Sequence, residues 1–243
     1  MSHRAEHSVE CRPSQASTQK KGVVWKRTRH SHRGRQDPVE KAKKLADLDM
    51  LQWAAAAGEI DLFYLDESGV SLWLPVEYSY FFVGEQKRLE QTSRRGQRIS
   101  ILGLLQPLVS FVYGLVVGSF DSKRYITMMS EQARQAQLVF EQCGRIRVIV
   151  QDNGSAHTSQ SVQAKWAEWE ACGLYFFFLP KYCSELNPIE TEWHQLKTHE
   201  LRGHMFEHEL DLAYAVMDGI NARAQLGGYQ VERFRFPSKL APS

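Results

Sequence analysis

The sequence lacks a long hydrophobic run, and this absence limits where the protein resides. Crossing a bilayer as a helix takes about 20 consecutive apolar residues, whereas the longest apolar runs, 111–120 and 174–180, have the length of strands. No apolar stretch follows the charged N-terminal residues, so we expect neither a secretory signal nor a membrane partner. These absences predict a cytoplasmic protein.

Cysteine is scarce, and internal repeats are absent. The 243 residues include four Cys, widely spaced and without a Cys-x-x-Cys pair. This pattern argues against a disulfide scaffold and against a cysteine-based zinc site, and it indicates a reducing compartment. With 43% hydrophobic and 24% charged residues, the sequence is typical of a globular protein with one large domain or one domain and a tail.

Net charge is only +2, but its distribution is uneven. Residues 1–36 hold nine Lys or Arg against two Glu, a balance of +7, so the other 207 residues carry −5. A basic arm on an acidic body is suited to phosphate contacts, although a solvated, disordered tail has the same composition. Within the arm, Lys26, Arg27 and Arg29 follow the apolar residues 23–25, which favours nucleic-acid binding.

Hydrophobic periodicity predicts an α/β fold. Strands come first and then alternate with helices, an order that implies a mixed sheet with helices on both faces. We expect strands at 60–65, 71–74, 79–83, 99–105, 111–117, 145–150 and 174–179, and helices at 38–57, 122–142, 159–172, 188–202 and 207–225.

Three acidic residues stand at the ends of these predicted elements. Asp66 follows strand 60–65, Asp152 follows strand 145–150, and Glu190 lies in the first turn of a helix. Functional groups of open α/β sheets collect at the carboxyl ends of strands. Three carboxylates in one place raise each other's pKa unless a cation intervenes, and oxygen ligands favour Mg²⁺ or Mn²⁺. We therefore expect two metal ions, bridged by Asp66, with Asp152 holding one and Glu190 the other.

The residues around these acids resemble a known family. The sequence is similar to the DDE transposases, specifically the bacterial insertion-sequence-630 group related to the Tc/mariner superfamily, over roughly residues 23–225. The motifs that carry the resemblance are Asp66-Glu67-Ser68-Gly69, Asp152-Asn153 with His157, Leu179-Pro180, and Leu186-Asn187-Pro188-Ile189-Glu190 with Trp193 and Lys197.

The resemblance implies a ribonuclease-H-like core whose Asp, Asp, Glu triad binds metal. It also implies an enzyme that cuts DNA at element ends with water and then joins the freed 3′-hydroxyl to target DNA. Double-stranded DNA is then the partner, a homodimer on DNA is expected, and the compartment is the bacterial cytoplasm, at the nucleoid.

The resemblance also bears on domain organisation. We expect a basic, largely disordered arm at 1–36, a ribonuclease-H-like catalytic domain at 37–228 and a C-terminal tail at 229–243. Family members carry helix-turn-helix modules before the catalytic core, and residues 25–35 resemble the tail of one. A fusion or a partner protein would then supply recognition of the element ends.

Five further residues are candidates for supporting roles. Lys197 and His194 share a helix face with Glu190, where a cation either holds a terminal phosphate or is simply solvated. His157 either positions the scissile phosphate or caps the next helix. Asn153 and Asn187 are predicted to fix loop geometry through hydrogen bonds from side chain to backbone.

A basic loop and two alternative functions complete the predictions. The loop at 87–98, with Arg94 and Arg95, is placed to follow a DNA backbone, a contact that gives affinity without sequence preference. The triad is equally compatible with a ribonuclease-H-like nuclease that performs no strand transfer. An inactive DNA-binding remnant of a transposase is the other alternative.

Overall fold

A computed structural model describes residues 33–74 and 97–237. Contacts divide the chain into Met1–Gly34 and Arg35–Ser243, and the second unit contains the sheet. Its helices are α2 (Pro38–Ala56), α3 (Ser122–Cys143), α4 (Gln160–Ala171), α5 (Ile189–Gln195) and α6 (Glu209–Gly227), with short turns η1 (Arg33–Arg35), η2 (Ser184–Leu186) and the π-helical η3 (Leu196–Glu200). The strands are β1 (Ile60–Ser71), β2 (Arg98–Gln106), β3 (Ser110–Val117), β4 (Ile146–Gln151), β5 (Leu174–Phe178) and β6 (Gln230–Phe234).

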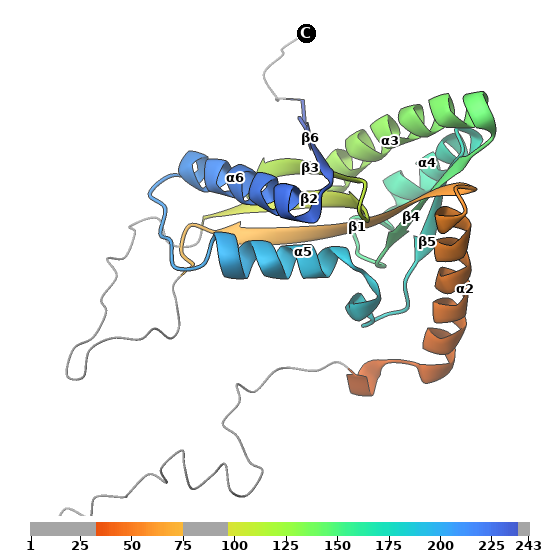
Figure 1. Cartoon of the computed structure of the whole chain (residues 1–243), viewed down its shortest axis with the longest axis horizontal. Coiled ribbons are helices and arrows are strands. Elements are labelled where there is room, and N and C mark those ends of the chain that lie inside the picture. Colours follow the sequence, from red (N-terminus) through yellow and green to blue (C-terminus); the bar gives the residue numbers. More distant parts are fainter. Residues whose placement is uncertain (1–32, 75–96, 238–243) are drawn as a thin grey trace, which may run out of the picture. The chain divides into compact units, whose positions relative to one another are not determined.

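These strands form one mixed sheet in the order β5-β4-β1-β2-β3-β6 (Figure 1). β1, β2 and β3 form an antiparallel meander. β4 is parallel to β1, β5 is parallel to β4, and β6 is parallel to β3. This mixed sheet flanked by helices confirms the predicted fold class.

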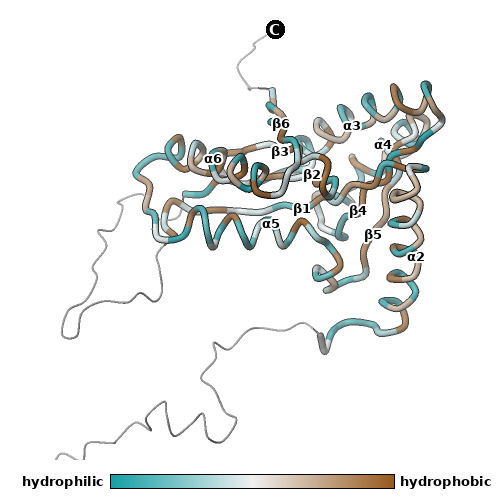
Figure 2. Tube along the Cα trace, viewed as in Figure 1, coloured by the Kyte–Doolittle hydropathy of each residue, from teal (hydrophilic) through white to brown (hydrophobic). Residues whose placement is uncertain are grey.

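Helices cover both faces of the sheet, and each face has its own hydrophobic core. On one face, Trp193 of α5, Val216 of α6 and Leu48 of α2 join one cluster. On the other face, Met128 of α3 and Trp169 of α4 join a second cluster. β4 is buried along most of its length, and both β4 and the edge strand β5 are largely apolar (Figure 2).

Helix boundaries follow capping signals in the sequence. Asp37 accepts hydrogen bonds from the backbone N–H groups of Val39 and Glu40, and Pro38 occupies the first turn of α2. Asp121 caps α3 in the same way through Arg124 N–H, and Gly144 ends that helix in the left-handed conformation, with φ 73°.

Several expectations about local structure are wrong. The strand expected at 60–65 continues to Ser71, because β2 pairs with β1 along its second half. The helix expected at 188–202 passes from α5 into the π-helical η3. A sixth strand, β6, lies in the segment for which the sequence predicted a tail, and the strand expected at 79–83 lies outside the described residues.

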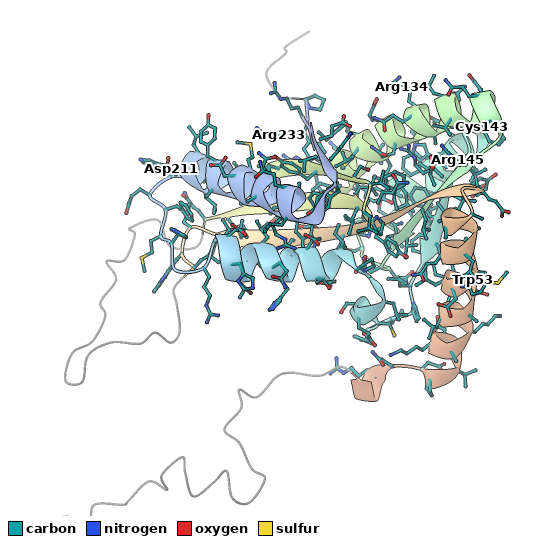
Figure 3. The ribbon with its side chains drawn as sticks, in the orientation of Figure 1. Trp53, Arg134, Cys143, Arg145, Asp211 and Arg233 are labelled. Atoms are coloured by element: carbon teal, nitrogen blue, oxygen red, sulfur yellow. The ribbon has the colours of Figure 1, made fainter. Side chains whose placement is uncertain are left out.

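α2 also buries less apolar surface than its pattern suggests. Leu48 is buried, but Trp53 is 78% exposed and Met50 is 71% exposed; the Trp53 side chain is labelled on α2 in Figure 3. α2 contacts the sheet at β1, and Lys44 of α2 lies over the Phe177 ring of β5, 4.5 Å from its centroid. Among the described residues, no helix is both long enough and apolar enough to span a bilayer.

Candidate active site

Asp66 lies within β1 rather than after it. Its Cα is opposite Gly103 of β2, and the pairing of β1 with β4 ends two residues earlier, at Tyr64 and Val150. The expectation that Asp66 follows a strand is therefore wrong, but its position relative to β4 is informative. Asp66 stands where β4 stops, so its side chain lies next to the loop that leaves β4.

That loop carries Asp152, directly after β4. The Asn153 side chain donates a hydrogen bond of 2.8 Å to the carbonyl oxygen of Leu179, which follows β5. Asp152 itself accepts one from Gly154 N–H at 3.0 Å. These bonds hold the loop against the neighbouring strand and leave the Asp152 carboxylate 62% exposed.

His157 connects this loop to the sheet. It is buried, its Nδ1 lies 3.0 Å from Asp152 Oδ1, and its ring stacks on Tyr125 of α3 with centroids 4.9 Å apart. The Tyr125 hydroxyl donates a 2.7 Å hydrogen bond to Gln151 Oε1. The sequence did not predict a functional role for Tyr125 and Gln151, because each is simply one position on an apolar helix face or strand. Together they fix the imidazole that contacts Asp152.

Glu190 reaches the same area from α5. The buried Asn187 side chain donates a 3.0 Å hydrogen bond to the carbonyl oxygen of Leu65, the residue before Asp66. Asn187 thus ties the start of α5 directly to β1, and Asn153 and Asn187 both make the bonds from side chain to backbone that the sequence predicts.

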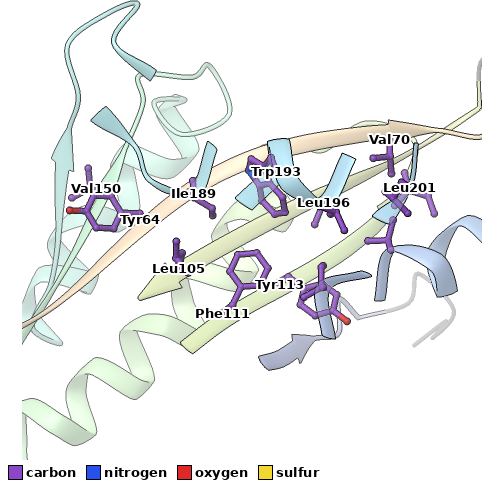
Figure 4. Close-up of a cluster of buried hydrophobic side chains, with 14 of the residues drawn as sticks. Tyr64, Val70, Leu105, Phe111, Tyr113, Val150, Ile189, Trp193, Leu196 and Leu201 are labelled. Carbon is purple, nitrogen blue, oxygen red and sulfur yellow. The ribbon is translucent and has the colours of Figure 1, made fainter. Parts of the chain in front are cut away.

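A glycine in β2, Gly103, allows α5 to pack close to the sheet. A Cβ added at Gly103 would come within 2.5 Å of the Trp193 ring. Figure 4 shows Trp193 between Ile189 and Leu196 in the core beneath α5. Because Gly103 is opposite Asp66, Trp193 packs beside the carboxylate and Glu190 stands one turn earlier on the same helix. Sequence reasoning missed Gly103, since a lone glycine in a strand carries little signal.

The three carboxylates interact electrostatically. Burial, followed by repulsion from Glu190 and then from Asp152, raises the pKa of Asp66 from 3.8 to about 7. Burial and the Asp152 charge also raise the pKa of Glu190, against the effect of Lys197. His157 lowers the pKa of Asp152. The site therefore combines an ionised Asp152 with two acids that burial and mutual repulsion make harder to ionise.

Lys197 is a cation whose charge acts on this cluster, where it opposes the rise in the pKa of Glu190. It lies in η3, and the charges of Glu190 and Asp66 oppose the lowering of its pKa that burial causes. His194, which the sequence placed on the same face, is exposed on α5. The remaining candidates, Lys26, Arg27, Arg29, Arg94 and Arg95, lie outside the described residues.

The donor chemistry of this site fits a hard divalent cation. Carboxylate oxygens are the ligands that Mg²⁺ and Mn²⁺ prefer, and a cation would relieve the repulsion that raises the pKa of Asp66. The three carboxylates do not surround a common point in this structure. Among the described residues, no group of three Asp, Glu, His or Cys is compact enough to hold an ion.

The mixed sheet with acidic residues at the end of β4 defines an α/β domain, and comparison with known families identifies it. The family described as DDE superfamily endonuclease matches residues 61–213, so the chain belongs to this family. That range includes Asp66, Asp152 and Glu190.

Solved structures of the Mos1 transposase share the fold. The Mos1 mariner paired end complex with Mn has a TM-score of 0.61 at 16% identity, covering 88% of this chain and 67% of that one. The paired end complex with Mg has 0.62 at 16%, covering 84% and 61%. The catalytic domain of Mos1 mariner transposase has 0.50 at 13%, covering 83% and 94%. The chain thus has the ribonuclease-H-like fold and spans about two thirds of the Mos1 chains in these DNA complexes.

No curated protein sequence matches the chain.

Proposed function

We propose that the chain is the catalytic part of a transposase that cuts DNA at element ends and joins the freed 3′-hydroxyl to target DNA. One observation carries this proposal. Asp66 of β1, Asp152 after β4 and Glu190 of α5 interact electrostatically, in a chain of the DDE endonuclease family. The solved Mos1 complexes with Mn and Mg, which contain paired transposon ends, support DNA as substrate and a divalent metal as cofactor.

In the proposed site, Asp66, Asp152 and Glu190 hold two Mg²⁺ or Mn²⁺ ions. Two such ions supply Lewis-acid stabilisation of the attacking and leaving oxygens in phosphoryl transfer. His157 orients the Asp152 carboxylate through its 3.0 Å contact. Asn187 and Asn153 keep the loops that carry Glu190 and Asp152 in place.

Lys197 is the residue proposed to hold a DNA phosphate. Its ammonium group interacts with Glu190 and Asp66, so a phosphate bound there lies beside the three carboxylates. The basic arm at 1–36 and the loop at 87–98 would add contacts to the phosphate backbone, which give affinity without sequence preference.

The wider setting is part of the same proposal. We place the chain in the bacterial insertion-sequence-630 group, with an arm at 1–36 and a catalytic domain that begins at 37 and extends past the expected boundary at 228 to include β6. A homodimer on DNA, a helix-turn-helix partner or fusion for recognition of the ends, and a location at the nucleoid follow from that placement.

A cleavage and joining assay tests the proposal. Labelled element-end duplex and supercoiled plasmid are incubated with the full chain in Mg²⁺ or Mn²⁺, alongside Asp152→Asn and the control Asp211→Asn, which alters an exposed residue at the start of α6. We expect metal-dependent nicking that Asp211→Asn retains and Asp152→Asn loses.

The products separate the candidate functions. Labelled ends joined to plasmid support a transposase, whereas nicking without joining supports a nuclease on the same fold. If the folded chain nicks neither DNA in either metal, the proposed activity is wrong for this chain and the inactive remnant is favoured. Nicking that survives in Asp152→Asn removes Asp152 from the site.

A further inference from the structure

A second polar site lies at the other end of β4. A cavity of about 200 Å³ lies between the sheet and α3, and the polar residues that line it include Arg147, Gln132, Gln135, Ser110 and Glu232. Arg147 is the second residue of β4, whereas Asp152 follows its last residue. Five residues of strand span about 17 Å, so the cavity is well separated from the candidate active site.

Arg147 is a buried cation in this cavity, only 7% exposed. Both of its hydrogen bonds to described residues use Nη1, which donates to Gln132 Oε1 at 2.6 Å and to Gln135 Oε1 at 3.3 Å. Its guanidinium also lies over the Phe63 ring, 4.6 Å from the centroid. All three partners are neutral, so none compensates its charge.

The carboxylate whose charge acts on Arg147, that of Asp61, is already engaged. Asp61 lies opposite Arg147 in the β1–β4 register, but its Oδ1 is 3.1 Å from Nε of Arg145. Two arginines thus share one aspartate, which leaves a surplus positive charge at the start of β4. A buried charge without a counter-ion is costly, so the surplus favours an anion in the adjacent cavity.

Two donors in this cluster have no acceptor among the described residues. These are Nε of Arg147 and Nε2 of Gln132, whose side chain is 1% exposed. Because Nη1 of Arg147 is occupied by the glutamines, the edge formed by Nε and Nη2 is the one that faces no described acceptor. That edge carries two parallel N–H groups, the geometry that binds two oxygens of a carboxylate or a phosphate.

We propose that this cavity binds a small oxyanion, either a carboxylate or inorganic phosphate, at the guanidinium of Arg147. A volume of about 200 Å³ accommodates such an anion or several waters. Water would satisfy the donors but would not neutralise the charge. Glu232, exposed at the cavity lining, adds a negative charge that opposes the entry of an anion.

Thermal unfolding of the full chain tests the site with defined anions. The unfolding midpoint is measured in rising inorganic phosphate, or in rising oxalate, with KCl adjusted to hold ionic strength constant. The assay contains no divalent metal and no DNA. We expect a saturable rise of about 3 °C at ten times the dissociation constant. The anion that acts at the lower concentration identifies which oxyanion the cavity prefers.

Variants test whether the rise in the unfolding midpoint depends on the cavity. Arg147→Met should abolish the rise, whereas Lys165→Met, which removes the same charge from a residue of α4 outside the cavity lining, should retain it. Glu232→Gln should shift saturation to a lower anion concentration, and Gln132→Leu to a higher one. The last two variants keep the test decisive if Arg147→Met fails to fold.

Two results would overturn the inference. One is the absence of any rise with either anion in the wild-type chain at constant ionic strength. The other is a rise of equal size and midpoint in the wild type, Gln132→Leu and Glu232→Gln, which would place the anion elsewhere on the molecule.

Discussion

The two ends of β4 carry charge imbalances of opposite sign and opposite accessibility. At the carboxyl end, the carboxylates of Asp66, Asp152 and Glu190 interact, and Asp152 is 62% exposed. At the other end, Arg147 is 7% exposed and bonds only neutral groups. A polymer such as DNA requires the first arrangement, because its backbone needs an exposed surface. The second arrangement suits a ligand small enough for a cavity of about 200 Å³.

The two ends also differ in how their side chains are held. Arg147 is fixed by the β1–β4 ladder and by two glutamines of one helix. At the acidic end, the segments that carry Asp152 and precede Glu190 are held by single asparagine side chains, which bond to Leu179 after β5 and to Leu65 within β1. Changes in the acidic end should therefore alter function more than stability, and four predictions test this difference, beginning with the largest expected effect.

Glu190→Gln should reduce metal-dependent cleavage by at least about a thousandfold, because it removes a proposed ligand of the reacting centre. Glu192, two residues away, provides the control. Its carboxylate accepts hydrogen bonds from Arg223 at 2.9 Å and from Tyr229 at 3.0 Å, on the side of α5 that faces α6. Glu192→Gln should lower the unfolding free energy by about 1 kcal/mol and keep cleavage. If the two variants lose equal activity, Glu190 has no special role.

Asp66→Asn should stabilise the metal-free protein, by an amount that depends on pH. The carboxyl has a pKa of about 7 in the fold against an ordinary value of 3.8, so the native state binds the proton more tightly. The wild type therefore loses stability as pH rises from about 4 to 7, and the neutral Asn does not. The gap in unfolding free energy should be small at pH 4 and about 4 kcal/mol at pH 8.

Denaturant titrations across this pH range, with a chelator present, measure that gap. Added Mg²⁺ at pH 8 should narrow it, because the ion stabilises the ionised carboxylate of the wild type. A gap that is independent of pH would show that Asp66 has an ordinary pKa, and a gap unaffected by Mg²⁺ would argue against metal binding at this residue.

The sequence predicts the acidic end of β4 far better than the other end. The motifs around Asp152 and Glu190 identify those residues, and hydrophobic runs locate most helices and strands. The extension of β1 through Asp66-Glu67-Ser68-Gly69 was not predictable, because these residues favour turns and only pairing with β2 keeps them extended. β6 was missed because it is a short edge strand with charged residues, Glu232 and Arg233.

Arg147 shows a different limit of prediction from the sequence. An arginine near the start of a strand predicts an exposed side chain. Its burial depends on Gln132 and Gln135, which α3 brings over the strand from 15 and 12 positions away. No local pattern contains this tertiary contact, so the cationic end could be found only in the fold.

Gly103→Ala should disturb the acidic end without touching a charged group. The added methyl would lie 2.5 Å from Trp193 and 3.0 Å from Phe111, so α5 must shift away from Asp66. We expect a loss of about 2 kcal/mol in unfolding free energy, and a larger proportional loss of cleavage. Gly69→Ala, also in the sheet, is the control, because the nearest atom is 4.0 Å away. Full cleavage in Gly103→Ala would mean that the spacing between α5 and β1 is unimportant.

Lys197→Met should have the smallest effect, because the residue is proposed to hold a phosphate rather than to ligate metal. Cleavage should fall about tenfold under single-turnover conditions, and the dependence of DNA binding on salt should lose about one unit of slope. Lys165→Met removes the same charge from α4, where Lys165 pairs with Glu168 at 2.6 Å, and should leave both quantities unchanged. If the salt slope is the same in both variants, Lys197 contacts no phosphate. Its position beside Asp66 and Glu190 would then serve only to offset their charge.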